Sequence, residues 1–186
     1  RRFAELVEPE TDPYDFWLDN YEEGMTQEFC DKFFAELRAK LVPLIAKVGA
    51  AEPPDTSLLN VRFPLDKQAE LSGWLMRFLG LDPDRSALTT TEHPFTIDFS
   101  RYDVRITTKY YEDAFASSMF SVIHEGGHAL YELGTAEEYA FTQLGRGVSM
   151  GVHESQSRFF ENIIGRSRAF CSLAWPELVR LCPELG

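Results

Sequence analysis

Apolar side chains recur at helical spacing through most of this 186-residue sequence, which predicts a mainly α-helical protein. Asp12-Pro13 begins a short predicted helix that Gly24 ends, and Thr26 has the position of an N-cap for a longer helix. Pro43 should kink or split this longer helix. A broad apolar stripe, typical of a helix face buried in a core, runs along it: Phe29, Cys30, Phe33, Phe34, Leu37, Leu41, Leu44, Ile45 and Val48.

Loops separate three further predicted helices, which span residues 64–79, 114–133 and 152–162. Gly80 and Gly134 follow the first two of these helices, where glycine is a common C-terminal stop. The segment 134–151 is mostly loop, and a shorter helical piece follows the helix of residues 152–162. Pro176 is expected to begin a last helix.

The pattern changes to alternation between the helices that end at residue 79 and begin at residue 114. Segments 88–90, 95–99 and 104–110 are rich in threonine, β-branched and aromatic residues. They predict a small antiparallel sheet of two or three strands that leads directly into the next helix. An edge strand of this sheet could hold an extended peptide by strand addition. The expected fold class is therefore mainly α with a small antiparallel β-sheet.

The composition narrows the classes of partner and the cellular location. The net charge of −12 argues against nucleic acid and anionic membranes as partners, since both favour basic patches. Three cysteines, at positions 30, 171 and 182, form no metal-binding spacing and are expected to be free thiols in a reducing compartment. No stretch is long and apolar enough to span a membrane, and no secretory signal is present, so a cytoplasmic location is expected.

The main candidate for chemistry is the stretch His124-Glu125-Gly126-Gly127-His128, which has the form H-E-x-x-H. Residues four apart lie on one face of a helix, so His124 and His128 can direct two imidazole nitrogens at one metal ion. Glu125 would lie beside them as the general base of a metallopeptidase. A chance match is expected on the order of 0.01 times in a chain of this composition. A buried helix whose histidines bond to polar neighbours is the other alternative.

The paired glycines of this stretch also need an explanation, because each costs about 1 kcal/mol relative to alanine inside a helix. A helix keeps such a pair where space is needed, for close helix packing or for the approach of a ligand to the backbone. Tight helix–helix contact would be compatible with a metal site.

A catalytic zinc ion usually has three protein ligands and one open position. Glu154 is the candidate for the third ligand, because it lies far enough from His128 for a loop and a second, antiparallel helix. Glu132, His153 and Glu161 are the competitors. Glu132 shares the helix with both histidines and fits a tetrahedral ion poorly, since the third ligand would lie a full turn away, about 5.4 Å along the axis. Spacing alone separates Glu154 from Glu161 only slightly.

Four blocks in order resemble the carboxypeptidase Taq family, the thermostable zinc metallocarboxypeptidases. They are His93-Pro94-Phe95, the D-x-R-x-T block of residues 103–107, the helix of residues 124–132, and the H-E-S-Q block of residues 153–157. The similarity extends from about residue 14 to residue 169. It implies a zincin-like H-E-x-x-H active-site helix and assigns the third ligand to Glu154.

The resemblance also implies an activity, a cofactor and an assembly. The expected protein is a cytoplasmic homodimer that binds one Zn²⁺ per chain, with Co²⁺ or Mn²⁺ as alternatives, and removes the C-terminal residue of peptides. Members of the family are longer helical proteins with further blocks after the third ligand. Residues 1–186 are therefore expected to be a single catalytic-core domain, either a piece of such a protein or a naturally shortened relative. The alternatives are another H-E-x-x-H metallopeptidase, either an aminopeptidase or an endopeptidase, and a non-catalytic metal-binding fragment.

Five other residues are candidates for substrate binding or for hydrogen bonds that support the metal site: Asp103, Arg105, Thr107, Ser155 and Gln156. Asp103 and Arg105 face the same side of a strand, where an ordinary ion pair is the simpler interpretation. The resemblance favours the other interpretation, in which they support the zinc helix or line the substrate cleft. Arg158 is either a surface residue or a partner of a carboxylate.

Overall fold

The computed structural model describes residues 1–186, which form two compact units. One unit contains residues 1–55 together with 149–151, and the other contains residues 56–148 and 152–186. The expectation of one catalytic-core domain over the whole chain stays a prediction. None of the helices combines the length and apolar character needed to cross a membrane.

The first unit consists of three helices, α1 (Arg2–Val7), α2 (Pro13–Tyr21) and α3 (Gln27–Gly49). The predicted caps are confirmed, because the Asp12 side chain accepts a hydrogen bond from the Tyr14 amide and the Thr26 hydroxyl accepts one from the Phe29 amide. Pro43 lies inside α3, which continues unsplit past it to Gly49.

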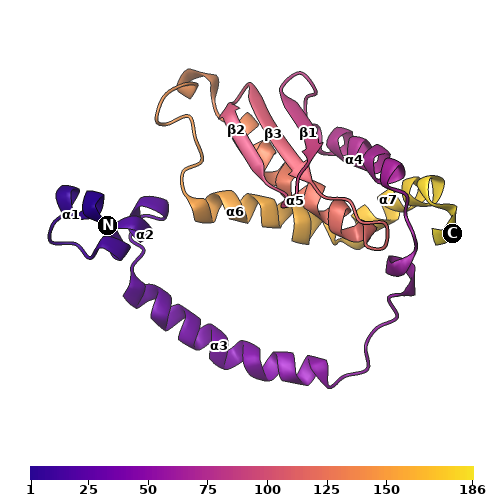
Figure 1. The fold of residues 1–186 in the computed structure, drawn as a ribbon, viewed down its shortest axis with the longest axis horizontal. Helices are drawn as coiled ribbons and strands as arrows, with labels where there is room; N and C mark the ends of the chain where they lie inside the picture. The colour runs from indigo at the N-terminus through magenta and orange to yellow at the C-terminus, as the bar shows by residue number, and fades with distance from the viewer. The chain divides into compact units, whose positions relative to one another are not determined.

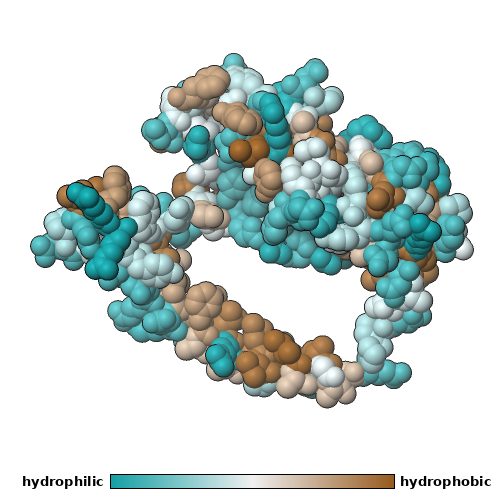
Figure 2. Space-filling view, viewed as in Figure 1, coloured by the Kyte–Doolittle hydropathy of each residue, from teal (hydrophilic) through white to brown (hydrophobic).

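The apolar stripe of α3 is exposed, so the prediction that it forms core is wrong for this chain. No residue of α3 is buried, and Phe33 and Ile45 are 51% and 64% exposed. Figure 2 shows hydrophobic side chains gathered along this helix. The helices α1 and α2 pack on each other through the rings of Phe3, Phe16 and Trp17. A helical pattern identifies the apolar face but not the element that covers it.

The second unit contains a three-stranded sheet in the order β1-β3-β2, formed by β1 (Ser86–Thr90), β2 (Thr96–Ser100) and β3 (Asp103–Thr108). The short turn between β2 and β3 makes this pair antiparallel. The chain between β1 and β2 reverses direction and leaves room for β3 between them, so β1 runs parallel to β3. The predicted all-antiparallel sheet is therefore wrong in one of its two pairings, while the mainly α class is confirmed.

Helices cover one face of the sheet and extend beyond it (Figure 1). The long helix α5 packs against β2 and β3, and α4 packs against α5. Gly80 ends α4 in the left-handed conformation, as expected. The helical elements of this unit are η1 (Ser57–Asn60), α4 (Leu65–Leu79), α5 (Phe115–Leu133), η2 (Glu137–Tyr139), α6 (Met150–Arg158, from residue 152 on), the π-helix η3 (Phe159–Gly165), α7 (Arg168–Leu181) and η4 (Pro183–Leu185).

The last helix differs from its prediction. Pro176 lies inside α7 and does not begin it. The helix begins instead after Ser167, whose hydroxyl accepts a hydrogen bond from the Phe170 amide. Ser167 thus supplies the side-chain cap that marks the start of the helix, and Pro176 is accommodated within it.

The core fixes the position of α5. Val104 and Ile106 of β3 are fully buried together with Val122 and Ile123 of α5. The buried amide of Gln68 donates to the carbonyls of Phe63 and Tyr111 and accepts from the Ser118 hydroxyl of α5. These bonds satisfy the polar groups of a buried side chain and tie the start of α5 to α4.

Both glycines in the middle of α5 are explained by close packing. A Cβ at Gly126 would collide with the end of the Leu79 side chain. A Cβ at Gly127 would lie 2.8 Å from the Ser157 Cα and 3.1 Å from the Gln156 carbonyl oxygen. The second clash is with backbone atoms, which cannot shift without a cost in free energy because the helices are closely packed. The expected tight helix contact is therefore present, between α5 and α6.

Gly127→Ala should lower the free energy of unfolding by about 1–3 kcal/mol, because overpacking forces α6 away from α5. Urea unfolding of the metal-free chain, followed by circular dichroism, measures this change. Gly73→Ala is the matched control, since Gly73 also lies inside a helix but a Cβ there meets only Arg77 Nη1 at 3.6 Å. That control should be neutral or stabilising by about 0.5–1 kcal/mol. Equal behaviour of the two variants would contradict the packing argument.

Candidate metal centre

His124 and His128 lie one turn apart on α5, so their rings project from the same face of the helix. Both side chains are mostly buried, with 17% and 16% of their area exposed. Glu154 comes from the neighbouring helix α6. Its Oε2 lies 3.3 Å from His128 Nε2 and 3.7 Å from His124 Nε2. The three residues thus each offer one potential ligand atom within 4.8 Å of the others.

These separations suit a tetrahedral ion. Ligand atoms at about 2.1 Å from such an ion lie about 3.4 Å from one another. The carboxylate-to-imidazole distances of 3.3 and 3.7 Å are close to that value. Two imidazoles and one carboxylate form a donor set found in catalytic zinc sites. The residues therefore fit a divalent metal ion, and their assignment as ligands stays a prediction.

Glu161, a competitor for the third ligand, contacts the far side of His124 instead. Its Oε2 lies 3.0 Å from His124 Nδ1, and its two oxygens accept hydrogen bonds from Arg158 and Arg166 at 3.2 and 2.7 Å. Although burial opposes it, the hydrogen bonds from Arg166 and His124 lower the pKa of Glu161. An ionised Glu161 would hold the His124 proton on Nδ1 and leave Nε2 free to bind an ion.

His153 and Glu132, the other two competitors, form a chain behind His128. His128 Nδ1 lies 2.6 Å from His153 Nδ1, and His153 Nε2 lies 2.7 Å from Glu132 Oε1. Burial, followed by the neighbouring His153 and His124, lowers the pKa of His128 to about 4. His128 is therefore neutral at physiological pH, as a metal ligand must be. The hydrogen bond to Glu132 raises the pKa of His153.

The second oxygen of Glu154 is also occupied. Arg158 Nε donates to Glu154 Oε1 at 2.7 Å, so Arg158 is a carboxylate partner as well as a partly exposed residue. Burial opposes ionisation, yet the hydrogen bond from Arg158 and the charge of His124 lower the pKa of Glu154. The hydroxyl of buried Ser157 lies within hydrogen-bonding distance of Glu154, 2.7 Å from its carbonyl oxygen and 3.1 Å from Oε2.

Ser157 therefore contacts the candidate ligand, whereas Ser155 and Gln156 make other contacts, and a role in substrate binding stays a prediction for both. The Ser155 hydroxyl donates to the Val152 carbonyl of its own helix, and Gln156 brings its backbone carbonyl close to Gly127. The signal that could have identified Ser157 is its spacing, because a residue three positions after Glu154 shares its helix face.

Glu125 is 8% exposed and lies next to the candidate ligands on α5. Its Oε2 accepts a hydrogen bond of 2.7 Å from the hydroxyl of Thr96, which belongs to the edge strand β2. Burial raises the pKa of Glu125, and the Thr96 hydrogen bond partly offsets this effect. The sequence pattern does not predict Thr96, because its contact with α5 depends on how the sheet packs.

An open pocket of about 530 Å³ reaches this carboxylate. Arg158 and Arg166 place positive charge on its wall, and the Arg166 guanidinium lies over the Phe120 ring at 4.0 Å from its centre. The pocket is lined by Leu59, His93, Pro94, Ala116, Ser117, Phe120, Ser121, His124, Glu125, Arg158, Glu161 and Arg166.

Of the three candidates on β3, Thr107 is the one that hydrogen-bonds to the segment bordering the pocket. Its hydroxyl oxygen accepts from the Phe95 amide and from the Thr91 hydroxyl, each at 2.8 Å, and so holds the segment that carries His93 and Pro94. Asp103 and Arg105 form an exposed ion pair of 2.7 Å with each other. This contact matches the simpler interpretation of the pair, and a role in substrate binding stays a prediction for both residues.

Comparison with known proteins finds a matching family and several similar proteins. The family model of the carboxypeptidase Taq (M32) metallopeptidases matches residues 1–185. Carboxypeptidase 1 of Bacillus subtilis is 42% identical over 184 residues, which cover 98% of this chain and 37% of that protein. Thermostable carboxypeptidase 1 of Pyrococcus furiosus is 41% identical over 189 residues, or 38% of its length.

Solved structures give the same result. The M32 carboxypeptidase of Deinococcus radiodurans R1 is 42% identical and superposes with a TM-score of 0.90, covering 98% of this chain and 37% of that structure. The apo-Mg structure of the Pyrococcus furiosus carboxypeptidase is 41% identical with a TM-score of 0.87, over 99% of this chain and 38% of that one. The chain thus spans little more than a third of the length of the relatives it matches.

Thr96→Val should raise the pKa of Glu125 further, because it removes the hydroxyl that stabilises the ionised carboxylate while preserving the shape of the side chain. The carboxyl ¹³C shift of Glu125, followed by NMR as a function of pH in the metal-free chain, measures this pKa. Thr96→Ser keeps the donor and should leave the pKa close to that of the unchanged chain. Identical titrations for the valine and serine variants would rule out the Thr96 hydrogen bond.

Proposed function

This chain belongs to the carboxypeptidase Taq (M32) metallopeptidase family, and from that membership we propose that it carries the active-site residues of a metallocarboxypeptidase. Such an enzyme hydrolyses the last peptide bond of a peptide and releases its C-terminal residue. The observation that carries the proposal is the convergence of His124, His128 and Glu154 beside the buried carboxylate of Glu125. These three side chains would hold one divalent ion per chain, Zn²⁺ in the first place and Co²⁺ or Mn²⁺ as alternatives.

The chemistry follows from the positions of the protein groups. An ion held by the three residues would polarise the scissile carbonyl and lower the pKa of a water molecule toward about 7. Glu125 accepts the proton of the attacking water and donates it to the departing amine. Thr96 holds one oxygen of that carboxylate, which leaves the other for proton transfer. Burial of Glu125 supports this role, because a raised pKa makes the carboxylate a stronger base for the proton of the attacking water.

The surroundings support a peptide as substrate. The pocket opens beside Glu125, and β2 is an edge strand whose Thr96 contacts that residue. An extended peptide could pair with this edge while its end enters the pocket.

We further propose a cytoplasmic homodimer with no nucleic-acid or membrane partner. The three free cysteines and the net charge of −12 support the location and the absence of such partners, and the homodimer rests on the family resemblance. For the 186-residue chain alone, the alternative is metal binding without turnover.

Glu125→Gln should lower turnover about 100-fold or more while the metal stays bound, because the amide cannot accept the water proton but leaves the three ligands in place. Turnover is measured on this chain and on a version with the full length of its relatives, and bound metal is measured by elemental analysis. The control is Glu138→Gln, the same change at an exposed position. Unchanged turnover in Glu125→Gln would show that Glu125 is not the general base.

His128→Ala should abolish tight metal binding, since it removes one of three proposed ligands. Calorimetric titration of the metal-free chain with Zn²⁺ tests this outcome without any assay of activity. An unchanged affinity would place the ion elsewhere.

Peptides blocked at either end separate the kinds of peptidase. An N-acetylated peptide should be hydrolysed, and the same peptide with a C-terminal amide should not be, because the proposed enzyme acts at a free C-terminus. Cleavage of the amide, or a requirement for a free N-terminus, would favour an endopeptidase or an aminopeptidase.

A further inference from the structure

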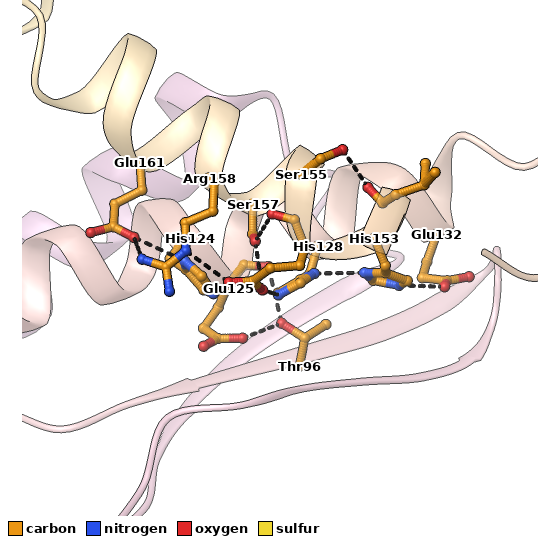
Figure 3. A network of polar contacts seen from close by, with 12 residues as sticks. Thr96, His124, Glu125, His128, Glu132, His153, Ser155, Ser157, Arg158 and Glu161 are labelled. Carbon is orange, nitrogen blue, oxygen red and sulfur yellow. Dashed lines mark hydrogen bonds and ion pairs between the residues drawn. The ribbon is translucent and has the colours of Figure 1, made fainter. Parts of the chain in front are cut away.

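His153 directs a ring nitrogen at another histidine and not at the candidate ion position. Its Nδ1 lies 2.6 Å from His128 Nδ1 (Figure 3). Two neutral imidazole nitrogens at this distance must share one proton, with one nitrogen donating and the other accepting. The location of that proton matters, because His128 can bind an ion through Nε2 only if its own proton is on Nδ1.

Glu132 determines which nitrogen donates. Its side chain is 6% exposed, it lies one turn beyond His128 on α5, and its Oε1 is 2.7 Å from His153 Nε2. A buried carboxylate requires a hydrogen-bond donor, so neutral His153 carries its proton on Nε2. Its Nδ1 is then an acceptor, which makes His128 Nδ1 the donor and leaves the lone pair of His128 Nε2 on the side of Glu154.

The loop between α5 and α6 holds this arrangement in place. A Cβ at Gly147 would lie 2.7 Å from His153 Cδ2 and 3.0 Å from Tyr131 Cε1, so the loop backbone packs directly on the His153 ring. Tyr131 meets the same ring edge-on, at 5.1 Å between centres. The ring therefore has little room to rotate away from His128 and Glu132.

We propose that Glu132 and His153 are positioning residues that fix the proton of His128 on Nδ1 and thereby set the metal affinity of the site. The inference rests on the proposed metal site and adds to it two residues that do not touch the ion. The two imidazoles are thus oriented by different partners, a carboxylate for His124 and a histidine backed by a carboxylate for His128.

The test compares two replacements of nearly equal shape. Asparagine can place its Oδ1 where His153 Nδ1 accepts, whereas leucine has the same size and no acceptor. His153→Leu should weaken Zn²⁺ binding about 10–100-fold, the range found when such supporting partners are lost. His153→Asn should retain most of the affinity. The affinity of the 186-residue chain for Zn²⁺ is measured by competition with a chromophoric chelator at neutral pH.

A second measurement does not depend on how the variants fold. Imidazole ¹⁵N NMR of the unchanged chain with Zn²⁺ bound should find the His128 proton on Nδ1 and the His153 proton on Nε2.

Glu132→Gln should weaken Zn²⁺ binding less than His153→Leu, because an amide oxygen can still accept from Nε2 but more weakly than a carboxylate.

The outcomes separate this inference from the function on which it rests. Equal affinities for the leucine variant and the unchanged chain, equal losses for leucine and asparagine, or a His128 proton on Nε2 would overturn the positioning role while the metal site stands. Failure of the unchanged chain to bind Zn²⁺ would overturn the proposed metal site and this role with it.

Discussion

The candidate site depends on the close approach of α6 to α5 at Gly127. Because residue 127 has no side chain, the backbone of Ser157 can pack directly on α5. This contact brings Glu154 within 3.3 Å of His128 and, further along the chain, Glu161 within 3.0 Å of His124. The same glycine that is unfavourable for an isolated helix thus allows two helices to meet at the distance that the donor atoms require.

Much of the fold could be predicted from local signals, because local signals decide where helices begin and end. Thr26, Gly80 and Gly134 mark helix ends in the sequence, and the structure has the ends at these positions. The errors concern contacts between distant segments. The pairing of β1 is parallel because its neighbour in the sheet is β3 and not β2, and the exposure of the α3 stripe depends on elements outside the helix. Neither property is encoded by the spacing of apolar residues.

In the candidate site, too, local spacing predicts some residues, and contacts between distant segments determine the others. Helical periodicity is sufficient to place His124, Glu125 and His128 on one helix turn, since their spacing is local. Glu154 required the family resemblance, because spacing scarcely separated it from Glu161. Thr96 could not be predicted from the pattern, since it reaches Glu125 from a strand. The spacing of Ser157 indicates only that it shares a helix face with Glu154. Roles that arise from tertiary contact become visible only when the contact is known.

The pairing of Arg158 with Glu154 Oε1 has a consequence for ion selectivity. Because Oε1 accepts from Arg158, it is a poorer donor to an ion, and monodentate coordination through Oε2 would be favoured. Two nitrogens and a single oxygen then make up the protein's share of the coordination sphere. Hard cations such as Ca²⁺ prefer about six to eight oxygen donors, which this donor set does not supply. A borderline-soft ion of low coordination number would match it better. Arg158 would thus influence the coordination of an ion that it does not itself contact.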